Sequence, residues 1–159
     1  MVPNIIDLCG DNVDYSENIG AGDQGIMFGY AADETDEKMP ATVVYAHAIT
    51  RRLSECRKKG IIPWLRPDGK SQVTFEYSRD VSLNNTSTEP GEGRLIPIRA
   101  PTIVISVQTD KGIELETIRT TLKKEVIEKV IPKHNLDDKT IYHIQPSGPF
   151  VIGGPQSDS

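Results

Sequence analysis

Apolar residues recur at three- and four-residue intervals in two stretches of this chain, which is the spacing of a helix that buries one face. In the first stretch they are Tyr45, Ala46, Ile49, Leu53 and Cys56. In the second they are Leu115, Ile118, Leu122, Val126 and Val130. The chain is therefore predicted to contain two amphipathic helices, each of which needs a second layer to cover its apolar stripe.

Residues at the ends of both stretches fit helix termini. Pro40 suits the first turn of the first helix, because its fixed φ matches a helix and its missing N–H is not needed there. Basic residues at 57–59 favour the negative end of the helix dipole, and Gly60 can adopt the left-handed conformation that ends a helix. Pro132 follows the second helix.

Segments rich in β-branched and alternating apolar residues lie between and after the helices, and they predict strands. These segments are 72–77, 95–98, 102–108 and 140–144. The residues from Pro63 to Gly69 look like a punctuated turn, and 82–93 like a flexible hairpin loop without hydrophobic periodicity. The order of elements predicts an α+β fold, a mostly antiparallel sheet with two helices packed on one face.

Composition excludes several classes of protein. The chain has 159 residues and a net charge of -5, which suits one domain and disfavours nucleic acid as a partner. No apolar run approaches the roughly 20 residues that span a bilayer, so no membrane association and a cytoplasmic location are expected. Cys9 and Cys56 have no metal-ligand spacing and are expected to be free thiols. The three histidines form no HExxH or other close pair.

A glycine cluster at 20–25 reads GAGDQG and fits the GxGxxG pattern of dinucleotide-binding proteins. That pattern requires a hydrophobic strand before it and a helix opening within it. Polar residues precede it at 15–18, and Ile-Met-Phe-Gly follows at 26–29. The dinucleotide interpretation is therefore disfavoured, and taken alone the glycines would simply make a turn.

The whole stretch 20–31, GAGDQGIMFGYA, resembles the signature loop of the S-adenosylmethionine synthetases, and the resemblance continues through 33–35. Two further blocks are similar to the same family in the same order. They are LRPDGKSQVT at 65–74, and QPSG with FVIGGPQ between 145 and 156. The resemblance implies three parts: 1–19 as a remnant of an N-terminal domain or linker, 20–149 as the central domain, and 150–159 as a truncated start of the C-terminal domain.

The resemblance implies an enzyme that joins methionine to ATP. The methionine sulfur attacks C5′ of the adenosine, and the three phosphates leave together as tripolyphosphate, which is then hydrolysed. Family members use Mg²⁺ and K⁺. Such chemistry needs cationic groups or metal ions around an anionic leaving group, and carboxylates near a sulfur that becomes positive.

The resemblance also implies residues that bind ATP or methionine. Gly22 and Asp23 lie in the signature loop, where Asp23 would face the nucleoside and methionine. Asp68, Gly69 and Lys70 match a block with nucleotide contacts, Asp68 toward ribose or adenine and Lys70 toward the charge of ATP. Without the family, Asp23 would be a turn cap, and Pro-Asp-Gly at 67–69 a simple turn.

A second group of implied substrate-binding residues lies near the C-terminal end. Ser147 and Gly148 match a nucleotide-contacting segment, with the hydroxyl as a hydrogen-bonding group. Phe150 would offer a ring for adenine to stack on, and Asp158 would contact methionine.

Two residues depart from the family pattern within these motifs. Pro149 stands where arginine is expected and removes a cation with five donors. Ser157 stands where glycine is expected. Since the family's His-Pro-Asp-Lys motif and several phosphate-binding cations are also absent from this sequence, the chain alone is expected to be inactive or nearly so. The alternatives are a truncated, non-catalytic homologue that associates with a complete synthetase subunit, and a module that only binds nucleotide. The expected partners besides ATP and methionine are further copies of the chain, as a homo-oligomer, or a full-length synthetase subunit.

Overall fold

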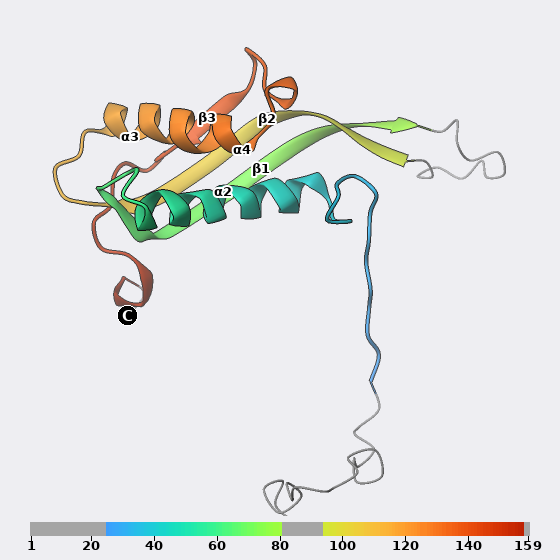
Figure 1. Cartoon of the computed structure of the whole chain (residues 1–159), viewed down its shortest axis with the longest axis horizontal. Coiled ribbons are helices and arrows are strands. Elements are labelled where there is room, and N and C mark those ends of the chain that lie inside the picture. The colour runs from blue at the N-terminus through green and yellow to red at the C-terminus, as the bar shows by residue number, and fades with distance from the viewer. Residues whose placement is uncertain (1–24, 81–93, 158–159) are drawn as a thin grey trace, which may run out of the picture.

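The computed structural model describes residues 25–80 and 94–157, which form one sheet covered by helices (Figure 1). Helix α2 spans Ala41–Lys58, strand β1 Leu65–Asp80 and strand β2 Arg94–Thr109. Helix α3 spans Leu115–Leu122 and runs through the π-helical turn η2, Lys123–Ile127, into α4, Glu128–Val130. The short turn η3, Lys133–Asn135, leads to strand β3, Ile141–Ile144, and a last turn, η4, spans Gly154–Gln156.

The sheet has the order β1-β2-β3. Strands β1 and β2 form a long antiparallel hairpin whose register runs from Leu65 opposite Thr109 to Asp80 opposite Arg94. Strands β2 and β3 are parallel, so the chain needs a crossover between them, and the α3 to α4 helix provides it. The predicted α+β class with a mostly antiparallel sheet is confirmed.

Both helices lie on the same face of the sheet. The guanidinium Nε of Arg52 in α2 donates a hydrogen bond to the backbone carbonyl of Glu125 in η2 at 3.0 Å, which joins the helices side by side. Their apolar stripes and one face of the strands share a single core. The largest fully buried side chains in it include Ile49, Ile62, Leu65, Ile103, Ile105, Ile118, Leu122, Ile127 and Ile131.

Helix α2 begins and ends where the sequence predicts. Pro40 precedes its first residue, and Gly60 just beyond it has a φ of 68°. The carboxylate of Glu34 accepts the free N–H of Ala41 at 2.9 Å, and it also accepts the hydroxyl of Tyr77 at 2.7 Å. One carboxylate therefore satisfies the start of α2 and ties it to strand β1.

Two sequence predictions about the hairpin are wrong. The expected turn at 67–69 lies inside β1, and the two expected strands at 95–98 and 102–108 are a single strand, β2. Strand β1 is an edge strand with a register shift between Leu65 and Gly69. An irregular edge tolerates Pro67 because the missing N–H breaks no ladder hydrogen bond there.

The second helix departs from its predicted face by one residue. Ile118, Leu122 and Val126 are buried as expected, but the adjacent Ile127 is buried as well. A regular helix would turn consecutive residues about 100° apart. The π-helical turn spans 123–127, and Val126 and Ile127 within it are both buried in the core.

Cys56 is a free, buried thiol, and burial raises its pKa. Within residues 25–80 and 94–157, no helix is long and apolar enough to cross a membrane. Cys9, the segment 1–18 and the loop 82–93 lie outside the described residues.

Replacing Ile105 by alanine tests the position of the core. Ile105 is fully buried in the central strand, so we expect Ile105→Ala to lower the free energy of unfolding by about 3 kcal/mol. Ile141, on the edge strand β3, has 54% of its surface exposed, and Ile141→Ala is a matched control expected to cost less than about 1 kcal/mol. Urea unfolding followed by circular dichroism measures both, and equal losses would contradict the assignment of the core.

The hydrogen bond between Tyr77 and Glu34 predicts a dependence of stability on pH. Burial, and secondly the bond to Glu34, raises the pKa of Tyr77 to about 12. The folded protein therefore holds this proton more tightly than the unfolded chain, whose tyrosines titrate near pH 10. The stability that Tyr77 contributes is complete below about pH 10 and is lost as the pH rises through about 12.

A Tyr77→Phe variant isolates that contribution. We expect it to cost about 1 kcal/mol at pH 8, where the wild type has the hydrogen bond. The difference between variant and wild type should shrink in urea titrations between pH 10 and 12. A difference that stays constant over that range would show that the hydroxyl does not have the raised pKa.

Candidate functional site

The segment after β3 crosses the end of the sheet and continues along β2. The N–H of Gln145 donates to the carbonyl of Ile105 at 2.9 Å, directly after the last pair of the β2 to β3 ladder. After a turn, the N–H of Thr109 donates to the carbonyl of Phe150 at 3.0 Å, and Phe150 forms a parallel bridge with Gln108. Residues 145–156, here named the tail, are thus held against β2 at two points.

The side chain of Gln145 fixes the turn between those two points. It is buried, and its amide bonds the backbone of Val107 twice: Oε1 accepts the Val107 N–H at 3.0 Å and Nε2 donates to the Val107 carbonyl at 2.7 Å. The backbone of Gln145 has a φ of 51°, and Gly148, at 87°, donates its N–H to the Gln145 carbonyl at 3.0 Å. The pair of side-chain bonds holds a left-handed conformation that is uncommon for a residue with a Cβ.

Asp68 of β1 holds the far end of the tail. Its Oδ2 accepts the N–H of Gly154 at 3.0 Å. A Cβ at Gly153 would lie 2.6 Å from the same oxygen, so the tail approaches Asp68 as closely as it does because residue 153 is glycine. Gln108 of β2 connects the tail to β1. Its Nε2 donates to the Val151 carbonyl at 2.9 Å, and its Oε1 accepts the backbone N–H of Asp68.

Lys70 lies on the same face of the sheet as this cluster. It pairs with Ser106 in the register, and Ser106 is two residues from Gln108, so the side chains of all three share one face. Lys70 is exposed, and its ammonium makes no ion pair with the described residues. This face of the sheet, which points away from the helices, therefore carries a cation two residues along β1 from Asp68.

The structure brings some of the predicted residues together and leaves others apart. Asp68 contacts the tail at Gly154, Phe150 of the tail pairs with Gln108 of β2, and Lys70 shares that face of the sheet. Ser147 is exposed in the turn next to Gly148. Gly69 faces the helix layer, because a Cβ there would be in ordinary contact with Leu53 and Val107. Gly22, Asp23 and Asp158 lie outside the described residues, so their proximity to Asp68 stays a prediction.

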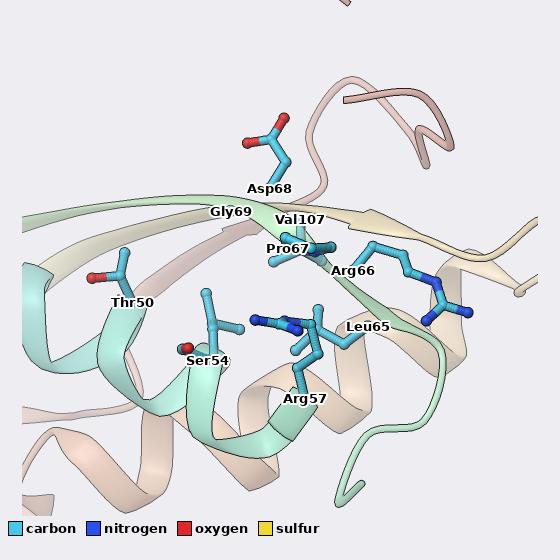
Figure 2. A pocket seen from close by; sticks show the side chains of 10 residues that line it. Thr50, Ser54, Arg57, Leu65, Arg66, Pro67, Asp68, Gly69 and Val107 are labelled. Atoms are coloured by element: carbon cyan, nitrogen blue, oxygen red, sulfur yellow. The ribbon is translucent and has the colours of Figure 1, made fainter. Parts of the chain in front are cut away.

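A small cavity lies behind β1, between that strand and α2 (Figure 2). It has a volume of about 110 Å³ and is lined by Thr50, Leu53, Ser54 and Arg57 of α2, by residues 65–69, and by Val107. Asp68 contributes its backbone to this cavity, whereas its carboxylate points to the other side of β1, toward the tail (Figure 2). The cavity is therefore separate from the cluster that holds the tail.

Metal ligands are sparse near Asp68. In the part of the chain that the structure describes, no group of three or more His, Cys, Asp or Glu side chains is placed to hold an ion. Mg²⁺ prefers an octahedron of oxygen ligands, and the single carboxylate of Asp68 already accepts a backbone N–H. The described residues thus contain no cluster of such side chains for the Mg²⁺ that the family uses.

Sequence reasoning missed two residues that build this region, Gln108 and Gln145. Gln108 stands at the end of an apolar strand and Gln145 directly after another. A lone amide at the end of an apolar strand is a signal for a side chain that bonds backbone groups. Which groups it bonds depends on the parallel pairing of β2 with β3, which the sequence does not specify.

The architecture is that of an α+β domain in which a C-terminal segment is bound along the sheet. A family model, S-adenosylmethionine synthetase, central domain, matches residues 18–150. The match covers most of the chain, and the chain belongs to the S-adenosylmethionine synthetase family. Its central domain is the part that holds Asp68, Lys70 and the start of the tail.

Substituting Gly153 tests the close contact between the tail and Asp68. A methyl group in Gly153→Ala must displace either the carboxylate or the tail, so the hydrogen bond from Gly154 should weaken. Loss of about 1.4 kcal/mol corresponds to about tenfold faster amide exchange at Gly154, measured by NMR. Ser157→Ala, at an exposed position directly after the tail, is the control and should leave that rate unchanged.

Proposed function

We propose that this chain provides the nucleotide-contacting surface of a methionine adenosyltransferase, and that the outer face around Asp68 and the tail is that surface. Its membership of the S-adenosylmethionine synthetase family supports the proposal. The observation that carries it is the convergence of Asp68, Lys70 and Phe150, from two segments about 80 residues apart, at one end of the sheet.

The two oxygens of Asp68 have different roles in this proposal. Oδ2 holds the N–H of Gly154 and so positions the tail. Oδ1 has no hydrogen-bond partner among the described residues and can accept a hydrogen bond from a ribose hydroxyl. A carboxylate that is already oriented by the protein loses little entropy when it binds a hydroxyl.

Lys70 and Phe150 supply the other two parts of a nucleotide site. The ammonium of Lys70 is a mobile point charge that can approach a phosphate of ATP. The ring of Phe150 is half-buried, and its backbone is held by Thr109, so it can present a face to adenine. Ser147 lies exposed in the fixed turn with a hydroxyl free to bond the nucleotide.

The reaction requires attack of the methionine sulfur on C5′ of the bound adenosine, with the three phosphates leaving as a unit. The residues of this chain would contribute orientation of the nucleoside, because holding the C5′ carbon in line with the sulfur lowers the entropy to be lost in the transition state. The charge on the phosphates is balanced in this family with Mg²⁺ and K⁺, and Lys70 would add one cation to that balance.

A second function is favoured by Pro149. This residue, exposed directly before Phe150, stands where the resemblance leads us to expect an arginine. Without that guanidinium the surface would hold a nucleoside more readily than it would stabilise a leaving polyphosphate. The corresponding proposal is a non-catalytic homologue that retains the fold and associates with a complete synthetase subunit.

Calorimetric titration with ATP tests the nucleotide surface. We expect Lys70→Met to weaken ATP binding about tenfold, since it removes a charge-assisted contact to phosphate. Lys139→Met is the matched control, because Lys139 is an exposed lysine in the turn before β3 and lies away from the tail. Equal binding by both variants, or no heat with the wild type, would contradict the proposal.

Adding the chain to a complete synthetase distinguishes the two functions. An active component should restore S-adenosylmethionine formation to a synthetase whose own central domain has been disabled, in the presence of methionine, ATP, Mg²⁺ and K⁺. A non-catalytic partner should co-elute with the intact synthetase and change its rate without restoring the disabled one. Neither association nor any change in rate would remove the second function.

A further inference from the structure

Arg57, in the last turn of α2, is a half-buried cation. Its guanidinium makes no ion pair or hydrogen bond within residues 25–80 and 94–157. The other half-buried arginines all form ion pairs: Arg52 with Glu55, Arg99 with Glu76 and Asp137, and Arg119 with Glu116. Since a guanidinium that leaves water without an anion costs free energy, this arrangement indicates a place for a negatively charged group.

Arg57 lines the cavity between α2 and β1, and its side chain reaches from the helix toward the strand (Figure 2). The other charged residues of the lining are directed elsewhere. The carboxylate of Asp68 points to the opposite side of β1, and Arg66 points away from the cavity and pairs with Asp110 at 2.6 Å (Figure 2). The cavity therefore holds one positive charge that no carboxylate of its lining balances.

The end of α2 offers little opposition to an anion in this place. The last carbonyls of a helix carry a partial negative charge when they lack partners. Here the carbonyl of Glu55 accepts the N–H of Lys59 at 2.9 Å, and the carbonyl of Cys56 accepts the N–H of Ile61 at 2.9 Å. Lys58 adds a further positive charge to the same turn.

The rest of the cavity wall combines a hydroxyl with apolar groups. Ser54 is three residues before Arg57, so both lie on one face of the helix, and its hydroxyl has no hydrogen-bond partner among the described residues. At the back, side-chain atoms of Leu53 and Val107 lie 3.5 and 3.6 Å from where a Cβ of Gly69 would be. An apolar wall lowers the local dielectric constant, which strengthens the attraction between a guanidinium and an anion.

The size of the cavity restricts what it can bind. Its volume is about 110 Å³. Pockets for drug-sized ligands span roughly 300–1,000 Å³, so a nucleoside is too large for this one. One water molecule takes up roughly 30 Å³ in the liquid, so the cavity has room for a group of several heavy atoms. A single oxyanion such as phosphate or sulfate fits these limits.

We propose that the cavity between α2 and β1 is a binding site for a free tetrahedral oxyanion of the phosphate or sulfate type. The planar fork of Arg57 would donate to two of its oxygens, and the hydroxyl of Ser54 to a third. A planar carboxylate has only two oxygens, so it cannot offer a separate oxygen to each of these donors.

A bound oxyanion would connect α2 to residues 65–69 of β1, because both form the lining of the cavity. The register of the hairpin shifts within that segment, and the opposite side of the segment carries the Asp68 carboxylate that holds the tail. The site is thus placed to stabilise the part of β1 on which the tail depends. It uses neither Lys70 nor Phe150, so the inference is independent of the proposed nucleotide surface.

Titration of the full chain with inorganic phosphate, followed by NMR, tests the site. Ionic strength is held constant so that general screening does not change. We expect the Nε–H signal of Arg57 and the amide signals of Ser54 and Gly69 to shift and to saturate. Arg57→Met keeps a long side chain that favours helices, and it should weaken binding at least about tenfold. Arg51→Met is the matched control, because Arg51 is an exposed arginine of the same helix outside this lining.

A second variant keeps the test valid if Arg57→Met alters the fold by circular dichroism. Ser54→Ala places a strong helix former in α2 and should weaken phosphate binding about fivefold. Shifts that never saturate, or binding that is equal in Arg57→Met, Ser54→Ala and Arg51→Met, would overturn the proposal.

Other anions identify the chemistry that the site selects. Sulfate should bind like phosphate, whereas acetate and phosphoserine should bind more weakly, acetate for its planar shape and phosphoserine for its size. Acetate bound as tightly as phosphate would overturn the tetrahedral selectivity, and phosphoserine bound as tightly would overturn the assignment to a free ion. Lys70→Met should keep the phosphate shifts at Arg57, so a failure of the nucleotide proposal would leave this result intact.

Discussion

The paired hydrogen bonds between the side-chain amide of Gln145 and the backbone of Val107 determine where the tail lies. Both partners are buried, so breaking these hydrogen bonds would leave polar groups without a partner and would cost free energy. They also hold Gln145 in a left-handed conformation, and that conformation redirects the chain from β3 toward the end of β2. The position of Phe150 and the contact of Gly154 with Asp68 depend on this one change of direction.

Asp68 connects the fold to the proposed chemistry because it serves both. One oxygen binds the tail, and the other is available to a ligand. A substitution of Asp68 is hard to interpret, since its loss would release Gly154 of the tail as well as remove a contact to the ligand. Lys70 is the more informative position for that reason: it shares the face but takes no part in holding the tail.

Hydrophobic periodicity and the positions of proline and glycine predicted the helices and most of the sheet. Ile49, Leu53 and Ile118 are buried as their spacing indicates, because helical burial is a local property of the sequence. Pro67 led to a wrong prediction, since a proline indicates a turn unless its strand is known to lie at the edge of a sheet. Gln108 and Gln145 were missed for a related reason: their partners are set by the parallel pairing of β2 and β3. The residues that build the site are thus those whose roles depend on tertiary contacts.

The π-helical turn at 123–127 also bears on how this chain should be compared with its relatives. One extra residue in a helix would rotate everything after it by about 100° and point Val126 and Val130 away from the sheet. A wider turn absorbs that residue locally and keeps the crossover to β3 in place. A relative shorter by one residue here would keep the same packing with an ordinary helix, so the length difference belongs inside this helix and not in the loops that flank it.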